Sequence, residues 1–120
     1  MTVGVDIGTT SVKAVAVDAH GVIVDRVRVP HPVVVPAPDR LEHDADRAWR
    51  RGPRRALRRL AGTAPAAVAV SSMVPSLTAV DRRGRPVAPG LLYGDVRGAG
   101  DGGEAAGFLR WLADEVPDAA

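Results

Sequence analysis

The residues best suited to chemistry lie near the start of the chain, at positions 3–13, in the run Val-Gly-Val-Asp-Ile-Gly-Thr-Thr-Ser-Val-Lys. An ionised aspartate only accepts hydrogen bonds, so Asp6 suits a hard cation such as Mg²⁺, which phosphates carry with them. Gly8 lets the backbone approach a ligand closely or take a positive φ. The hydroxyl residues at 9–11 and the lysine add hydrogen-bond donors and positive charge. The predicted phosphate ligands are Gly8, Thr9, Thr10, Ser11 and Lys13, and the predicted metal ligand is Asp6.

Two apolar runs flank this turn and must position it. Val3–Ile7 leads into the turn and Val12–Val17 leaves it, which indicates two antiparallel strands joined by a tight turn. An ordinary hairpin turn is the alternative, since glycine and threonine are common in turns. We favour phosphate binding, because a plain turn has little use for an aspartate that closes an apolar strand and for three successive hydroxyls. The Walker pattern is absent, and the G-x-G-x-x-G fingerprint does not fit this turn, because Gly4 and Gly8 are too far apart and a strand follows where the fingerprint requires a helix.

The next segments extend this pair of strands into an antiparallel meander. Asp18–Gly21 has the composition of a turn, and Val22–Val29 has that of a third strand. The prolines at 30, 32, 36 and 38 exclude a regular helix from the loop that follows. Within that loop, Val33–Val35 would form at most an edge strand.

An arginine-rich helix is predicted after the proline-rich loop. Asp44 is the predicted N-cap, and apolar residues recur at helical spacing as far as Leu60. Gly52-Pro53 predicts a kink or two helical pieces. Seven arginines lie between Arg47 and Arg59 with no acidic residue among them. They could form an anion or nucleic-acid patch, but we favour an ordinary solvated helix face, since charged helix faces are common.

A short apolar run, Ala66–Val70, predicts a strand that is buried on both faces and therefore parallel to its neighbour. The segment Ser71–Ser76 leaves the carboxyl end of that strand, which is where ligands bind in open α/β sheets. Leu77–Val80 predicts another strand, and Asp81–Gly84 predicts a turn. A glycine-rich linker at 98–103 and an amphipathic helix that ends at Pro117 follow.

Composition excludes several classes of protein. The chain of 120 residues is 46% hydrophobic and 25% charged, which is typical of a globular domain and not of a disordered one. It has no cysteine, so disulfides and thiolate metal sites are excluded. No apolar run is long enough to span a membrane and no signal peptide is evident, so we expect a cytoplasmic protein without a membrane partner. The net charge of +2 and the few aromatic residues argue against nucleic acid as a partner.

Four stretches, in order and across nearly the whole chain, resemble the FGGY carbohydrate kinases, the family of xylulokinase and glycerol kinase. Asp6–Ser11 is similar to the family's first phosphate motif. Glu42, Asp44 and Trp49 resemble its E-x-D-x-x-x-x-W stretch. Ser71–Asp81 with Gly84-Arg85-Pro86 is similar to its strand–turn segment, and Leu92–Arg97 resembles its W-x-D-x-R motif with Tyr93 in place of tryptophan.

This resemblance implies the fold class. It is the α/β, ribonuclease-H-like fold of the actin, sugar kinase and Hsp70 ATPases, present here incompletely. The implied segments are a strand meander with the phosphate loop at 1–29 and a proline-rich loop at 30–43. An arginine-rich helix at 44–61, strands with sugar-side loops at 66–97, and a linker with a helix at 98–120 follow. Together they would form the N-terminal portion of the kinase's N-terminal domain, with the remainder of the kinase chain as a partner.

The resemblance also implies the function. It is ATP-dependent transfer of a phosphate to a sugar or polyol hydroxyl, with ATP and Mg²⁺ as cofactors and a small sugar or polyol as substrate. Asp95 would face the sugar with Arg97 orienting it, although an ion pair that only braces a loop explains the same two residues. The turn Met73-Val74-Pro75 stands where relatives carry Q-M-H or Q-R-E, and its side chains cannot hydrogen-bond sugar hydroxyls. Either another segment recognises the sugar, or the substrate is less polar than a pentulose.

No catalytic residue is predicted within this chain. The family's catalytic aspartate, second phosphate loop and adenosine pocket lie beyond residue 120, and Asp101, Asp114 and Asp118 come too early to be that base. We therefore expect the chain alone to be inactive. Exposed apolar sheet surface would favour self-association, which is compatible with a homo-oligomer. A phosphate-binding module without catalysis and a nucleic-acid binder remain as the alternative functions.

Overall fold

The computed structural model describes residues 1–117 and 119. The chain folds as two compact units, each made of two separate segments. Unit 1 comprises Met1–Pro32 and Arg47–Ser72, and unit 2 comprises Val33–Asp46 and Met73–Ala120. No helix among the described residues is long and apolar enough to cross a membrane.

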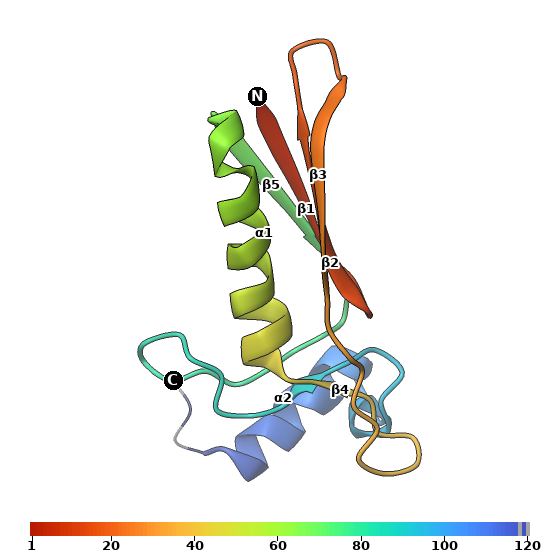
Figure 1. The fold of residues 1–120 in the computed structure, drawn as a ribbon. Coiled ribbons are helices and arrows are strands. Elements are labelled where there is room, and N and C mark those ends of the chain that lie inside the picture. Colours follow the sequence, from red (N-terminus) through yellow and green to blue (C-terminus); the bar gives the residue numbers. More distant parts are fainter. Residues whose placement is uncertain (118, 120) are drawn as a thin grey trace. The chain divides into compact units, whose positions relative to one another are not determined.

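Unit 1 is built on a four-stranded sheet in the order β3-β2-β1-β5 (Figure 1). Its strands are β1 (Thr2–Ile7), β2 (Ser11–Val17), β3 (Ile23–Pro30) and β5 (Ala67–Ser72). The first three are antiparallel to one another, and β5 is parallel to β1. The predicted meander and the parallel fourth strand are therefore confirmed.

The hairpin turns of this sheet follow from their residue types. Asp18 Oδ1 accepts hydrogen bonds from the backbone N–H groups of His20 and Val22, at 2.8 and 2.9 Å. Gly21 takes a φ of 81°, a left-handed conformation that costs glycine little. These features confirm the turn predicted between the second and third strands, because an aspartate that bonds the backbone ahead of it is a common way to close a turn.

The arginine-rich helix lies along one face of the sheet (Figure 1). It begins as a π-helical segment, η1 (Asp46–Arg51), and continues without a gap as α1 (Gly52–Leu60), followed by a 3₁₀ turn, η2 (Ala61–Thr63). The predicted change at Gly52-Pro53 is thus a switch from π to α geometry. Pro53 has no N–H to donate to the helical segment before it, so one backbone hydrogen bond is missing at this switch.

The core of unit 1 lies between α1 and the sheet. It contains the alternate residues of the strands that face the helix and the residues of α1 that face the strands. Its fully buried members are Val3, Val5, Val12, Ala14, Ala16, Val29, Ala56 and Leu60. Six of the seven arginines from Arg47 to Arg59 are exposed and Arg50 is half-buried, as expected of a solvated helix face.

The prediction that β5 is buried on both faces is wrong. All six of its residues are exposed, with Val68 at 48% and Val70 at 63%. The reason is its position at the edge of the sheet, since α1 packs over β2 and β3 and does not extend over β5. An apolar run therefore identified the strand and its parallel pairing but not its environment.

Unit 2 has little regular structure apart from one helix. A short strand, β4 (Glu42–His43), pairs antiparallel with β6 (Gly90–Leu91), and a 3₁₀ turn, η3 (Val96–Gly98), precedes α2 (Glu104–Glu115). One cluster of its buried apolar residues comprises Ala79, Leu91, Phe108 and Leu112. The helix touches the η3 turn backbone to backbone, because a Cβ on Gly107 would lie 2.5 Å from the carbonyl oxygen of Gly98.

The strand predicted at Leu77–Val80 is not formed. Leu77 makes an isolated bridge to Leu91, and Val80 makes another to Pro86. Prolines at 86 and 89 cannot donate hydrogen bonds, so a continuous ladder cannot form opposite this segment. The predicted turn after it is confirmed, with the Gly84 N–H donating to the Asp81 carbonyl at 2.8 Å and Gly84 at a φ of 70°.

Candidate functional site

The turn between β1 and β2 is tight and has a carboxylate beside it. The Gly8 N–H donates to the Ser11 carbonyl at 3.0 Å, which closes the turn. A Cβ on Gly8 would lie 3.2 Å from that carbonyl oxygen and 3.6 Å from Asp6 Oδ2. Any side chain at position 8 would therefore crowd the backbone and occupy space next to the carboxylate. We call residues 6–13 the β1–β2 turn site.

Polar side chains gather on the sheet face opposite α1, close to this turn. In the strand register, Asp6 of β1 lies opposite Lys13 of β2 and beside Ser71 of the parallel strand β5. Cross-strand neighbours point to the same face, and Val5 and Ala14 are buried on the other face with α1. These three polar residues border a hollow of about 380 Å³ whose remaining lining is mostly apolar.

The three predicted hydroxyl ligands differ in exposure. Thr10 is exposed and Thr9 is half-buried, whereas Ser11 is only 1% exposed. The Ser11 hydroxyl accepts a hydrogen bond of 3.2 Å from Arg28 Nε. Among the three residues, Thr10 is therefore the most exposed to solution and Ser11 the least.

A histidine that the sequence analysis missed holds the turn from behind. The backbone N–H of His31 donates to the Thr10 carbonyl at 3.0 Å, and its Nε2 lies 2.9 Å from the Gly8 carbonyl. A carbonyl oxygen only accepts hydrogen bonds, so Nε2 carries the proton of this bond. The side chain is 6% exposed. The sequence signal available was its position between Pro30 and Pro32, because the two prolines restrict the backbone on either side of the histidine.

The turn site fits a cation that arrives with a phosphate. Among residues 1–117 and 119, no group of three or more His, Cys, Asp or Glu side chains could hold a metal ion. Mg²⁺ keeps several waters and is commonly bound by one or two carboxylates together with substrate phosphates. The single carboxylate of Asp6 suits that arrangement, and Lys13, its cross-strand partner, carries a positive charge.

In unit 2, Asp95 and Arg97 form a buried ion pair. Arg97 Nε donates to Asp95 Oδ1 at 2.8 Å, and Arg97 Nη2 donates to Asp95 Oδ2 at 2.7 Å. The third nitrogen, Nη1, donates to Glu42 Oε1 at 2.7 Å. The guanidinium also lies over the Trp111 ring, 4.8 Å from its centre. Every nitrogen of the Arg97 guanidinium thus has a carboxylate partner, either Glu42 of β4 or Asp95, the residue just before η3.

The Asp95 carboxylate accepts further hydrogen bonds from the backbone N–H groups of Leu41 and Arg97. Burial acts to raise the pKa of Asp95, but the hydrogen bonds from Arg97 and from these backbone groups outweigh it and leave the pKa below its usual value. The hydrogen bond to Asp95 acts oppositely on Arg97, whose pKa is raised above its usual value despite burial. Both side chains therefore stay charged in unit 2 at neutral pH.

This pair has the geometry of a loop brace. Asp95 is 3% exposed, and its two oxygens receive all of these bonds, so the carboxylate has little capacity left for a ligand. Tyr93, two residues before Asp95, does reach solvent, at 45% exposure. At the other predicted sugar-side position, Val74 is 80% exposed and Met73 and Pro75 are half-buried.

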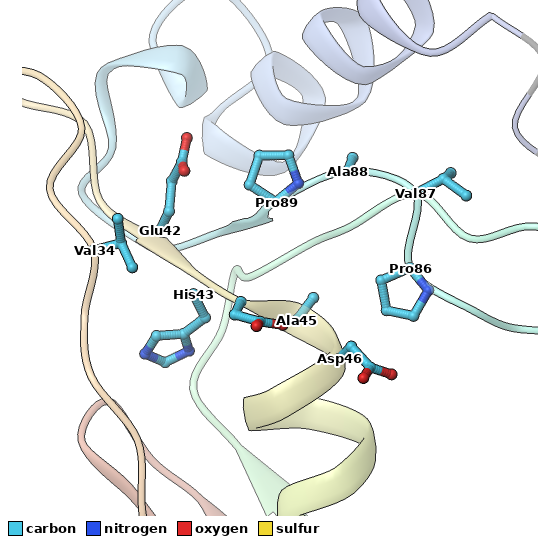
Figure 2. Close-up of a pocket in the computed structure, with 10 residues that line it drawn as sticks. Val34, Glu42, His43, Ala45, Asp46, Pro86, Val87, Ala88 and Pro89 are labelled. Carbon is cyan, nitrogen blue, oxygen red and sulfur yellow. The ribbon is translucent and has the colours of Figure 1, made fainter.

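A second hollow, of about 550 Å³, lies in unit 2 beside β4 (Figure 2). Figure 2 shows the Glu42 carboxylate and the His43 ring leaving the strand in opposite directions, with Pro86 and Pro89 across the hollow from them. Its lining contains Glu42, Asp44 and Asp46 but no lysine or arginine. Such a surface can accept hydrogen bonds from hydroxyl groups and has no charge with which to bind a phosphate.

Comparison with known proteins places these features in context. The family profile described as "FGGY family of carbohydrate kinases, N-terminal domain" matches residues 1–102. The xylulose kinase of Streptomyces rubiginosus is 38% identical over 106 residues, which cover 85% of this chain and 21% of that protein. The glycerol kinase of Methylobacterium radiotolerans is 31% identical over 144 aligned positions, covering 96% of this chain and 28% of that protein.

Solved structures show the same fold. The xylulose kinase from Rhodospirillum rubrum matches 96% of this chain and 29% of its own, with a TM-score of 0.79 and 26% identity. The glycerol kinase of Plasmodium falciparum, at 16% identity, matches 98% of this chain and 30% of its own with a TM-score of 0.77. The fold is that of the sugar kinases of the actin and Hsp70 superfamily, as predicted. The chain spans between 21% and 30% of the length of these relatives.

Proposed function

Because the chain belongs to the FGGY family of carbohydrate kinases, we propose that it provides the first phosphate-binding turn of an ATP-dependent kinase. The reaction is the transfer of the γ-phosphate to a hydroxyl of a sugar or polyol. The observation that carries this proposal is the arrangement at the β1–β2 turn site. There Asp6 and Lys13 lie opposite each other beside a tight turn, in which a Cβ at position 8 would lie 3.2 Å from the Ser11 carbonyl oxygen.

Each residue of the turn site has a role that its chemistry allows. Asp6 would hold Mg²⁺, Thr9 and Thr10 would donate hydrogen bonds to phosphate oxygens, and Lys13 would neutralise phosphate charge. Gly8 and Ser11 keep the turn narrow, and Ser11 does so with its hydroxyl bonded to Arg28. Bound Mg²⁺ would supply further neutralisation of the charge that builds up during phosphoryl transfer. The chain's own part is thus positioning and electrostatic stabilisation.

On the substrate side, we assign Asp95 and Arg97 a positioning role. They fix the turn that follows Tyr93, whose ring is exposed. Met73, Val74 and Pro75 offer the substrate an apolar surface, because their side chains neither donate nor accept strong hydrogen bonds. This composition implies one of two things. Either the substrate has an apolar edge, or another segment recognises its hydroxyls.

We propose that none of residues 1–117 and 119 is the general base that removes the proton from the substrate hydroxyl. Asp101 and Asp114 are exposed and belong to segments outside both hollows. We therefore propose that the 120-residue chain binds ATP weakly and shows no turnover. Sugar-dependent ADP release by the pure chain would contradict this statement.

The experiment uses the product of the complete reading frame that encodes this chain. ADP release is measured by a coupled assay with a panel of ketoses and polyols that includes D-xylulose and glycerol. D6N and K13M should each lower kcat by about 100-fold, the size expected when a preorganised charge contact to the transition state is removed. The matched control is D25N, since Asp25 is an exposed aspartate on β3 of the same sheet.

Three outcomes separate the alternatives. Sugar-dependent ADP release that D6N and K13M abolish and D25N leaves intact supports the kinase. Binding of MgATP without turnover, with no D-x-x-G segment encoded after Ala120, supports a non-catalytic phosphate-binding module. ADP release that is unchanged in D6N and K13M contradicts the assignment of the β1–β2 turn site.

A further inference from the structure

A row of polar side chains crosses all four strands of unit 1 next to the turn site. The pairing places Ser71 beside Asp6, Asp6 opposite Lys13, and Lys13 opposite Arg28. Cross-strand partners share a face of the sheet, so all four side chains lie on the face away from α1. The alternate residues Val27 and Val29 of β3 pack on the other face, in the core with α1. Arg28 therefore extends the turn site by one strand.

The juxtaposition of Lys13 and Arg28 is unfavourable unless an anion is present. Like charges directly opposite each other on antiparallel strands destabilise a sheet. Asp6 lies on the far side of Lys13 and not between the two cations. In the part of the chain that the structure describes, no ion pair involves Lys13 or Arg28, whereas other cations of the chain, Arg85 and Arg97, do have carboxylate partners.

The Arg28 side chain is also fixed by a hydrogen bond, unlike a surface arginine that extends into solvent without a partner. Its Nε donates to the buried hydroxyl of Ser11 at 3.2 Å, so the guanidinium is anchored at the carboxyl-terminal side of the turn. A guanidinium has five N–H donors, and this bond uses one of them. The two terminal nitrogens remain for a ligand, in the fork geometry that suits a phosphate.

We propose that Arg28 is a second cationic ligand for the oligophosphate that Lys13 binds. This inference rests on the proposed function of the β1–β2 turn site and adds a residue to it. Neighbouring strands lie about 4.8 Å apart, so two cations on adjacent strands can contact one chain of two or three phosphates. Lys13 acts as a point charge, and Arg28 acts as a bidentate donor to the same chain. The shared ligand chemistry is a magnesium-bound di- or triphosphate, either free or as the tail of a nucleotide.

The test is a binding titration of the 120-residue chain. Binding is monitored by ¹H–¹⁵N NMR spectra that include the arginine Nε–H signals. Two probes are compared, magnesium tripolyphosphate and MgATP. R28Q should weaken the binding of both by about tenfold or more, as expected for loss of a charge-assisted hydrogen bond. R28K should have a smaller effect, because it keeps the charge and loses the fork. The Nε–H signal of Arg28 should shift on binding.

The matched control is R26Q. Arg26 lies on the same strand and the same face, two residues farther from the turn, and is exposed. R26Q should weaken binding by less than about threefold, which is small beside the tenfold loss expected when a charge-assisted hydrogen bond is removed. A general electrostatic effect of positive charge on β3 would weaken R26Q and R28Q equally, and that result would overturn the proposal.

K13M separates this inference from the proposed function. Weaker binding in both K13M and R28Q supports both proposals. Weaker binding in K13M with wild-type affinity in R28Q and R28K overturns the role of Arg28 and leaves the turn site intact. Absence of any binding to the unchanged chain contradicts the turn site and the role of Arg28 together. Equal loss for the two probes identifies the phosphates as the bound part, whereas an effect confined to MgATP contradicts the proposed contact.

Discussion

Replacing Arg97 by methionine should destabilise unit 2 severely. The substitution keeps an unbranched side chain of similar length, but it removes the charge and three side-chain hydrogen bonds, of 2.8, 2.7 and 2.7 Å. Asp95 would be left as a buried carboxylate at 3% exposure without a cation. Breaking a buried ion pair from one side typically costs about 3–5 kcal/mol. The total stability expected for a chain of this length is about 6–18 kcal/mol, so the loss is a large part of it.

The assay is urea unfolding followed by tryptophan fluorescence. The chain has two tryptophans, Trp49 and Trp111. Substitution of Trp49 by phenylalanine leaves Trp111, which contacts Arg97 directly, as the reporter of unit 2. With a urea dependence of about 2 kcal/mol per molar, the loss corresponds to a midpoint lower by about 2 M. R97K, which keeps the charge but not the planar fork, should fall between R97M and the unchanged chain.

The matched control is R85M. Arg85 also pairs with an aspartate, Asp81, and its Nε lies 2.9 Å from the carboxylate, but the arginine side chain is 56% exposed. Exposed ion pairs contribute little, so R85M should leave the midpoint close to that of the unchanged chain. If R97M lowers the midpoint no more than R85M does, the buried pair does not stabilise unit 2 and the reasoning fails.

The pH dependence gives a second check on the same pair. The pKa of Asp95 is lowered in the folded chain, so its contribution to stability is complete above the ordinary pKa of an aspartate, about 3.9. That contribution is lost as the pH falls through the lowered value. In R97M, burial without the arginine would raise the pKa of Asp95, and protonation would relieve the buried charge. The stability difference between the unchanged chain and R97M should therefore narrow as the solution is acidified from pH 7 to pH 4. A difference that widens over this range would contradict the assignment.

Three further predictions concern other parts of the chain. G107A should lower the free energy of unfolding by about 3 kcal/mol in urea unfolding, because its Cβ would lie 2.5 Å from a backbone carbonyl oxygen. The control, G62A, should be nearly neutral, because Gly62 has open space around it. H31A should weaken the binding of magnesium tripolyphosphate about threefold to tenfold through loss of its bond to the turn, and H20A, at an exposed hairpin, should not. V70K should reduce concentration-dependent self-association in sedimentation velocity, because Val70 is 63% exposed on an edge strand; unchanged association would show that the contact lies elsewhere.

Local pattern predicted the parts of the fold that depend on local physics. Short turns rich in Asp and Gly, placed between apolar runs, can form only tight hairpins, so the meander of β1, β2 and β3 was predictable. The residue types at the β1–β2 turn site favoured phosphate binding for the same local reason, and that role stays a prediction. The turn predicted at 81–84 is formed for the same reason.

The errors arose where a residue's surroundings come from distant parts of the chain. The apolar composition of β5 could not reveal that α1 leaves it uncovered, and the pattern at Leu77–Val80 could not reveal prolines opposite its ladder. His31 and Arg28 were missed because each acts through a contact with a residue 17 or more positions away.

The sequence by itself determined the family, through the resemblance of four motifs along the chain. It also determined the hairpin and the residue types at its turn, because spacing along one strand or turn fixes those. Only the tertiary structure decided which charges lie together. It placed Arg28 opposite Lys13 through strand register, and it brought Glu42 to Arg97 across 55 positions of the chain. Register and long-range closure depend on how whole elements pack, and no short window of sequence contains that information.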